Sequence, residues 1–288
     1  MSTLIQIVAL LAVAPLAHGA MRSLRARLAG RPGPSPFQPY RDLAKLWTKE
    51  ALMPEGVSPL VSATPGLALG IALVFAAAIP LSAGAPAKTI DIIGLAMLLA
   101  LGRFVLVLSA LDSRSAFTGM AASREMSFST LVEPVLIVAV LGGMTLGTSS
   151  LAGFGSGPFD LAKLLSAVGL FVVILAETAR VPIDNQETHY ELTMIHEGLV
   201  LEYAGWQLAV LSYAAQIRQI CFLVLIAVMM PGAGLVAVAT WVAFVAVAIT
   251  ITETLFAKVR LFEIPQLVVA ALIFSIVGIL LRAGVVTL

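Results

Sequence analysis

Residues 206–230 read WQLAVLSYAAQIRQICFLVLIAVMM, a mainly apolar stretch with five polar residues, Gln207, Ser212, Gln216, Arg218 and Gln219. A helix of this length rises roughly 37 Å, which exceeds the roughly 30 Å thickness of the hydrocarbon core of a bilayer. The apolar residues follow one another without the alternation that marks a half-buried strand. Because a backbone in lipid must satisfy its own hydrogen bonds, this stretch is predicted to be a transmembrane helix.

Similar stretches recur along the whole chain. Of its 288 residues, 60% are hydrophobic and only 11% are charged, whereas soluble domains carry roughly 25% charged residues. The sequence therefore predicts an all-α integral membrane protein, with residues 1–288 forming a single polytopic domain. We expect a bundle of about eight transmembrane helices, over residues 2–20, 60–82, 89–111, 131–149, 161–178, 206–230, 235–257 and 263–283.

Lys and Arg residues indicate how the bundle is oriented. They gather in the loop after the first span and then in alternate loops, and cytoplasmic loops are the ones that collect basic residues. The first span has no basic residue before it, unlike a cleavable signal peptide, so we expect it to be retained. Both termini are predicted to lie outside the cytoplasmic membrane, and the predicted cytoplasmic loops are 21–59, 112–130, 179–205 and 258–262.

A short amphipathic helix is predicted after the first span. Residues 30–39, GRPGPSPFQP, disfavour helix through their prolines and glycines, and YRDLAKLWTKEAL follows them. At helical spacing the apolar face of this segment consists of Tyr40, Leu43, Leu46 and Trp47. The basic side chains of the segment suit either lipid headgroups or a protein partner, and both interpretations stay open for Arg41, Lys45 and Lys49.

Several classes of function are disfavoured by composition. The net charge of +1 gives no field for nucleic acid. Cys221, the single cysteine, cannot form an internal disulfide or hold an iron–sulfur cluster by itself, so it is interpreted as a small core residue. His18 is the lone histidine of the predicted spans, so a bis-histidine haem site is not expected. The sequence predicts no cofactor, metal site or catalytic residue in this chain.

Charged residues within the predicted spans are candidate functional residues. Each costs about 2.5–3.5 kcal/mol at a helix centre on insertion scales. They could pair with one another as purely structural ion pairs. Alternatively, the carboxylates could exchange protons along a hydrated path while the arginines tune them. The residues concerned are Arg103, Glu133, Glu177, Arg218 and Glu253.

An acidic interval runs from Glu177 to Gly205. It contains one arginine, Arg180, and no lysine. Clustered carboxylates at a membrane surface suit proton capture or a basic partner, although a solvated face would tolerate them equally. Two histidines in the interval, His189 and His196, could relay protons because an imidazole titrates near neutral pH, or could be plain surface residues. The acidic side chains are Glu177, Asp184, Glu187, Glu191, Glu197 and Glu202.

Three motifs carry a family resemblance. AETARVPID at 176–184, YEL at 190–192 and LEYAGWQLA at 201–209 resemble the signature region of the complex I subunit 1 family, a membrane subunit that complex I shares with group 4 membrane-bound [NiFe] hydrogenases. GMAASREMSFSTLVEP at 119–134 resembles the other cytoplasmic loop of that family. The variants SRE at 123–125 and THYELTMIHE at 188–197, with GRPGPSPFQPYRDLAKLWTKE at 30–50, resemble the formate hydrogenlyase branch. Complex I homologues typically read RxPFDL and EYSG where this chain has RVPID and EYAG, which argues against a quinone site.

The resemblance implies a membrane-anchor and coupling subunit of a membrane-bound hydrogenase complex that docks a soluble redox arm and links electron transfer to ion translocation. The implied partners are the hydrogenase large and small subunits, an iron–sulfur protein and antiporter-like membrane subunits, and the [NiFe] centre and iron–sulfur clusters would lie in the soluble partners. By motif, the coupling residues are Glu133, Glu177, Arg180, Asp184, Glu187, Glu191, Glu197 and Glu202, joined by the charged span residues Arg103, Arg218 and Glu253. The implied docking residues are Arg124 and Glu125, with Arg41 and Lys45 of the amphipathic helix.

Two alternatives remain at this point. One is the quinone-site membrane subunit of a complex I-like NADH:quinone oxidoreductase. The other is a stand-alone secondary transporter, a class that usually shows internal repeats or broken helices around a midplane site. We find no internal repeat, and the polar residues of this chain gather on one side of the membrane.

If basic residues set the orientation, reporters fused after residue 40 or residue 190 will be cytoplasmic and a reporter at the C-terminus will be external. The measurement is a pair of fusions, one active only outside the cell and one only inside. A cytoplasmic C-terminus would contradict an even number of spans.

Overall fold

The computed structural model describes residues 3–54, 56–81, 90–144, 151–184, 194–232 and 234–283. The regular structure of these segments is helical, which confirms the predicted all-α membrane fold. In chain order the elements are α1 Thr3–Leu28, α2 Gln38–Trp47, α3 Pro59–Ala78, α4 Ile92–Asp112, α5 Ala116–Gly142, a 3-10 turn at Leu151–Gly153, α6 Leu161–Glu177, α7 His196–Leu199, α8 Gly205–Met229, α9 Gly234–Leu255 and α10 Ile264–Arg282.

Within the described segments, seven helices are long and apolar enough to cross a membrane: α1, α3, α4, α5, α8, α9 and α10. The remaining predicted span, residues 161–178, corresponds to α6. Its 17 residues lie at the short end of the range for a spanning helix. Some predicted boundaries are wrong: the first span was expected to end at residue 20, but α1 runs to Leu28. Residues 112–130 were expected as a loop, but α5 begins at Ala116. Polar residues there can remain helical because Glu125 and Ser129 are buried inside the bundle.

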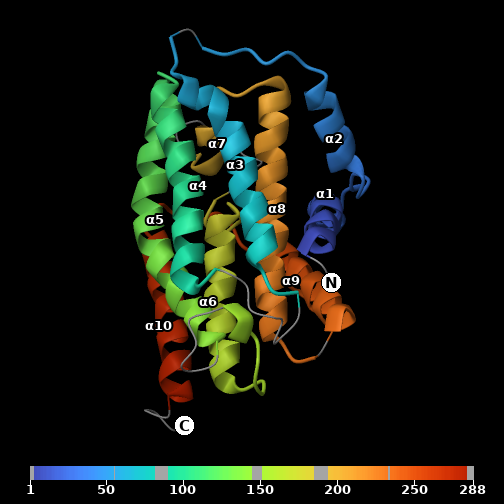
Figure 1. The fold of residues 1–288 in the computed structure, drawn as a ribbon, viewed down its shortest axis with the longest axis vertical. Helices are drawn as coiled ribbons and strands as arrows, with labels where there is room; N and C mark the ends of the chain where they lie inside the picture. The colour runs from blue at the N-terminus through green and yellow to red at the C-terminus, as the bar shows by residue number, and fades with distance from the viewer. Residues whose placement is uncertain are drawn as a thin grey trace.

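Helix α8 lies at the centre of the bundle. It contacts α1, α2, α3, α6 and α9, and its residues are apolar around most of its circumference, as a fully surrounded helix requires. Phe222 of α8 meets Phe75 of α3 edge-on, with ring centroids 5.2 Å apart. In Figure 1, α3, α4, α5, α8 and α10 follow the long axis of the molecule, and α1 and α9 are inclined to it.

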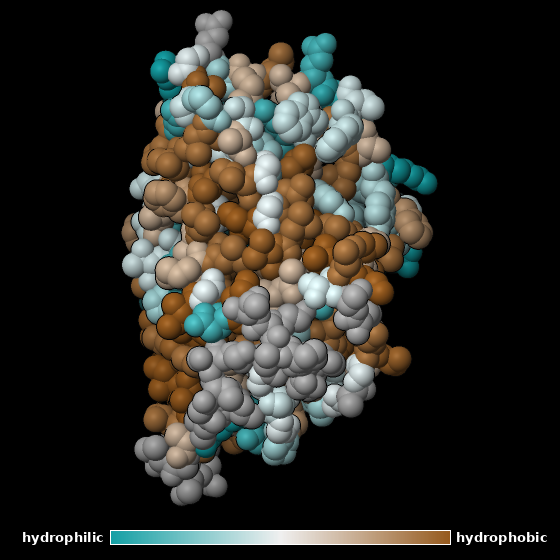
Figure 2. Space-filling view, viewed as in Figure 1, coloured by the Kyte–Doolittle hydropathy of each residue, from teal (hydrophilic) through white to brown (hydrophobic). Residues whose placement is uncertain are grey.

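The outer surface of the bundle suits lipid. Hydrophobic side chains cover much of the face shown in Figure 2, and hydrophilic ones gather at the end of the molecule where α2, α3 and α4 meet their loops. Large apolar residues such as Phe104, Phe244 and Ile273 are exposed. In water such a surface would aggregate, whereas in a bilayer it faces hydrocarbon.

The predicted amphipathic helix is α2. It packs against α1 and α8, and the Tyr40 hydroxyl donates a hydrogen bond to the carbonyl oxygen of Ala12. Close by, Gly205 begins α8 with φ +56°, and a Cβ atom there would lie 2.5 Å from the carbonyl oxygens of both Lys49 and Glu50. The backbone after α2 therefore passes over a site that only glycine can occupy without displacement.

Small residues let α5, α6 and α10 approach closely. A Cβ atom at Gly169 of α6 would lie 2.0 Å from Ser275 Oγ and 2.9 Å from the carbonyl oxygen of Ala271, both on α10. On the other side of the same contact, a Cβ atom at Gly278 would lie 2.6 Å from Ser166 Oγ. Helices in lipid associate through this kind of close backbone packing, because burial of apolar surface provides little net drive there.

Gly169→Ala is expected to lower the stability of the bundle by about 1–3 kcal/mol, because the backbone of α10 must move to admit the methyl group. Gly70→Ala on α3 is the matched control, since its Cβ atom would meet nothing within 4 Å and alanine favours a helix. The measurement is the midpoint of thermal unfolding in detergent. Equal midpoints for the two variants would contradict the tight α6–α10 contact.

Candidate functional site

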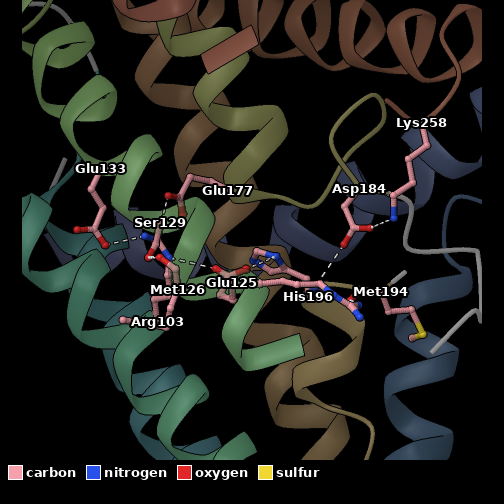
Figure 3. A network of polar contacts seen from close by, with 11 residues as sticks. Arg103, Glu125, Met126, Ser129, Glu133, Glu177, Asp184, Met194, His196 and Lys258 are labelled. Atoms are coloured by element: carbon pink, nitrogen blue, oxygen red, sulfur yellow. Dashed lines mark hydrogen bonds and ion pairs between the residues drawn. The ribbon is translucent and has the colours of Figure 1, made fainter. Parts of the chain in front are cut away.

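Arg103 of α4 is the centre of a buried polar cluster. Its Nε lies 3.2 Å from Glu125 Oε1 and its Nη1 lies 2.6 Å from Glu133 Oε1, while Nη2 donates to Glu177 Oε1. Figure 3 shows the guanidinium among these three side chains. Arg103, Glu125 and Glu177 are almost fully buried, whereas a third of the Glu133 side chain is exposed. We call these four residues the Arg103 cluster.

Three helices supply the Arg103 cluster. Glu125 and Glu133 are two turns apart on α5, so both side chains point toward α4. Glu177 is the last residue of α6, where the negative end of the helix dipole disfavours a carboxylate. A cation at this position is therefore required, and the fork-shaped guanidinium can donate to three acceptors at once.

A second arginine, Arg218 of α8, lies near two of these carboxylates. It interacts electrostatically with Glu177 and Glu125 without forming a direct ion pair among the residues placed in the structure. Two guanidinium groups therefore face three carboxylates. When all are ionised the group carries one surplus negative charge in a low-dielectric interior, which a single proton would neutralise.

His196, the first residue of α7, connects the cluster to its surroundings. Its Nδ1 lies 3.2 Å from Glu125 Oε2, and its backbone N–H donates to Asp184 Oδ2 at 3.2 Å. A cavity of about 20 Å³ lies between His196 and the carboxylates of Glu125 and Glu177. This volume holds about one water molecule.

The segment after α6 is a buried turn. Ala179 has a φ of +51°, and the Arg180 amide donates to the Leu175 carbonyl oxygen at 2.8 Å, closing the end of α6. This turn directs Arg180 toward α9, where its Nη1 lies 3.0 Å from Glu253 Oε1. Two buried atoms of this pair, Arg180 Nε and Glu253 Oε2, have no partner in the described part of the chain.

Further polar residues extend this second pair in two directions. His18 Nδ1 lies 3.3 Å from Arg180 Nη2 and 3.0 Å from Gln219 Oε1. At the end of the buried turn, Asp184 Oδ1 pairs with Lys258 Nζ at 2.8 Å. In Figure 3 the row of contacts runs without a break from Glu133 through Arg103, Glu125 and His196 to Asp184 and Lys258.

A larger cavity of about 290 Å³ lies between α1, α2, α3 and α8. Its wall is mainly apolar, and Phe75, Leu99 and Leu211 belong to it. Polar side chains also line it, among them His18, Thr178, His196, Glu197, Arg218 and Gln219.

Tyr203 joins the segment that carries His196 to the helices beside it. Its hydroxyl contacts Ser109 Oγ of α4 and donates to the Val61 carbonyl oxygen of α3 at 3.0 Å. Burial raises the pKa of the Tyr203 hydroxyl above its ordinary value, so it stays a proton donor at physiological pH.

The predicted site residues fall into distinct groups. Arg103, Glu133 and Glu177 meet in one cluster, and Arg180 pairs with Glu253. Glu125 was expected on a docking surface, but it is buried against Arg103, because a polar helical residue can face inward when a buried cation pairs with it. The Arg124 guanidinium donates to the Met194 carbonyl oxygen at 2.7 Å.

Apart from Asp184, the remaining predicted residues within the described segments are at least partly exposed. Arg41 and Lys45 are exposed on α2, and Glu202 is partly exposed before α8. Glu197 lines the 290 Å³ cavity. Glu187, Glu191 and His189 lie outside the described residues.

Sequence reasoning missed three contributors. His18 was considered only as a haem ligand, Lys258 was used only to orient the loops, and Gln219 was not considered. Lys258 adjoins a predicted span end opposite the acidic interval, which is a signal for pairing that the sequence did contain. His18 and Gln219 carried no such signal, because their partners are distant in sequence.

Chemically, the arrangement can hold and exchange protons. Arginine stays protonated, so Arg103 fixes charge and does not conduct. Proton exchange between Glu125, Glu133 and Glu177 then requires the carboxylates themselves and an intervening water. Within the described segments, no group of three or more His, Cys, Asp or Glu side chains is arranged to hold a metal ion.

Comparisons with known proteins agree with this architecture. The chain is 33% identical over 233 residues to formate hydrogenlyase subunit 4 of Escherichia coli, covering 76% of this chain and 74% of that protein. It is 35% identical over 227 residues to hydrogenase-4 component C of the same organism, covering 75% and 70%. An NADH-quinone oxidoreductase subunit of Desulfotalea psychrophila is 32% identical over 190 residues, covering 59% and 56%.

The fold also occurs in a solved structure of an archaeal respiratory complex, the membrane-bound sulfane sulfur reductase. A chain of that complex superposes with a TM-score of 0.78 at 20% identity, covering 96% of this chain and 98% of the other. The family model described as NADH dehydrogenase matches residues 1–283. The chain is therefore a multi-pass membrane protein that belongs to the NADH dehydrogenase family, together with the membrane subunits of formate hydrogenlyase and hydrogenase-4.

Proposed function

We propose that this chain is the coupling subunit of a membrane-bound [NiFe] hydrogenase complex of the formate hydrogenlyase type, located in the cytoplasmic membrane with both termini outside. The observation that carries the proposal is the Arg103 cluster, a set of buried carboxylates held by one guanidinium. The higher identity to the hydrogenase and formate hydrogenlyase subunits supports the choice of complex.

The Arg103 cluster has the properties of a proton-exchanging group. Together with Arg218 its side chains carry one surplus negative charge when all are ionised, and its three carboxylates offer alternative places for one proton. Glu133 is one-third exposed on α5, inside a membrane span, where an ionisable side chain needs a polar neighbour. An antiporter-like membrane subunit packed against this side of α5 would receive the proton there.

The other end of the polar row would face the soluble arm. The hydrogenase large and small subunits and an iron–sulfur protein would hold the [NiFe] centre and the clusters, while this chain supplies carboxylates and no redox group. The exposed Arg41 and Lys45 of α2 and the acidic interval after Asp184 would form its docking surface. Opposite charges at such surfaces mainly set the specificity and rate of association.

A second candidate function is supported by the 290 Å³ cavity. An apolar wall suits the apolar part of a lipophilic electron carrier, and the polar side chains of the cavity suit its headgroup. Binding of such a carrier would make the chain a quinone-site subunit. The outcome can be decided by purification in mild detergent. Co-purification of a nickel–iron large subunit supports the hydrogenase complex, and quinone reduction by the purified complex supports the alternative.

Glu133→Gln and Glu177→Gln test the coupling role, because glutamine keeps size and most hydrogen bonds but cannot titrate. We expect the assembled complex to turn over an artificial electron donor normally. In liposomes the proton gradient formed per electron pair should fall severalfold. Thermal stability should hold, since removal of one carboxylate leaves the two arginines facing two.

Arg103→Met is the comparison variant, which tests how much the ion pairs of Arg103 contribute to stability. It leaves three carboxylates facing only Arg218, so it should cost about 3–5 kcal/mol in stability. Unfolding midpoints, donor-dependent turnover and gradient formation are measured on the same preparations. If the glutamine variants are destabilised but form a normal gradient per electron pair, the cluster is structural and the proposal fails.

A further inference from the structure

His196 stands between the two cavities of the polar region. Among the residues described in the structure, it alone lines both the 290 Å³ cavity and the 20 Å³ cavity beside the Arg103 cluster. Its side chain is 21% exposed, and its Nδ1 lies 3.2 Å from Glu125 Oε2. Figure 3 shows the imidazole directed at Glu125 along the row of contacts.

The backbone around His196 is fixed from two sides. The Met194 carbonyl oxygen accepts from Arg124 Nη1 of α5 at 2.7 Å, and the His196 N–H donates to Asp184 Oδ2, which itself pairs with Lys258. A four-residue helix has little stability of its own. These contacts therefore hold the imidazole at hydrogen-bond distance from Glu125.

The charges around His196 favour passage of a proton. From α5 it faces Glu125, and Glu177 of α6 acts on it electrostatically. Asp184 lies at its backbone and Glu197 follows it in the chain. Arg103 and Arg218 oppose these carboxylates, but the Arg103 cluster and Arg218 together still carry one surplus negative charge.

We infer that His196 passes protons between the 290 Å³ cavity and the Arg103 cluster, a role that rests on the proposed coupling function. An imidazole accepts a proton at one ring nitrogen and releases one from the other. Here a hydronium ion in the larger cavity protonates Nε2 and becomes water, and the Nδ1 proton moves to Glu125 Oε2. The ring returns to its neutral form, Glu125 becomes a carboxylic acid, and no electron is transferred.

The cluster has no equivalent second connection to that cavity in the described segments. Arg218 also lines the 290 Å³ cavity, but a guanidinium cannot release its proton. His18 lines the same cavity and contacts Gln219 and Arg180 instead of the carboxylates of the cluster. A titrating side chain at position 196 is therefore the feature on which proton entry depends.

The test uses the assembled complex in liposomes with His196→Gln and His196→Ala. Glutamine can still donate to Glu125 but cannot shuttle, so gradient-coupled turnover should fall by about tenfold or more, while turnover of an artificial electron donor without a gradient stays normal. Added imidazole should restore coupled turnover of His196→Ala, because the adjoining cavity has room for the free base. A morpholine buffer of the same pH and ionic strength should not.

Ser212→Ala is the matched control, since Ser212 lines the same cavity on α8 without belonging to the cluster; its coupled turnover should be normal with or without imidazole. Normal coupling in His196→Gln overturns the inference, as does a loss in His196→Ala that imidazole leaves unrestored. If Glu133→Gln and Glu177→Gln lose coupling while His196→Gln keeps it, only the relay fails. If all three keep it, the proposed function fails as well.

Discussion

The burial of the Arg103 guanidinium is the constraint on which the polar interior depends. A cation inside a membrane bundle must be paired, and Arg103 is paired with carboxylates from two other helices. The three contacts fix the relative positions of α4, α5 and the end of α6. They also leave the region with more negative than positive charge, so the ion pairs that stabilise the bundle do not neutralise it.

The end of α6 and the turn after it supply residues to both buried ion-pair groups. Glu177 closes the helix toward Arg103, and the next few residues turn so that Arg180 reaches Glu253 on α9. Asp184 completes the turn by binding both Lys258 and the backbone of His196. One short buried segment therefore sets the geometry of both ion-pair groups. A displacement of this segment would disturb the ion pairs that it makes with α4, α5 and α9.

The family to which this chain belongs includes subunits of formate hydrogenlyase, hydrogenase-4 and NADH-quinone oxidoreductase. The apolar cavity and the Arg103 cluster are separate spaces that meet at His196. In the relay that we infer, protons enter from the first space and are held in the second.

Sequence by itself determined the helical membrane fold, because apolar runs long enough to cross a bilayer leave the backbone no other structure that satisfies its hydrogen bonds. It also identified Arg103, Glu133, Glu177 and Glu253 as costly charges that need partners. Only the tertiary structure decided the pairing. Glu125 lies in a polar segment that resembles a loop, and Arg180 pairs with a residue 73 positions away. Such partners are chosen by helix packing in three dimensions, where close contacts at residues such as Gly169 bring distant charges together, and no local pattern records that choice.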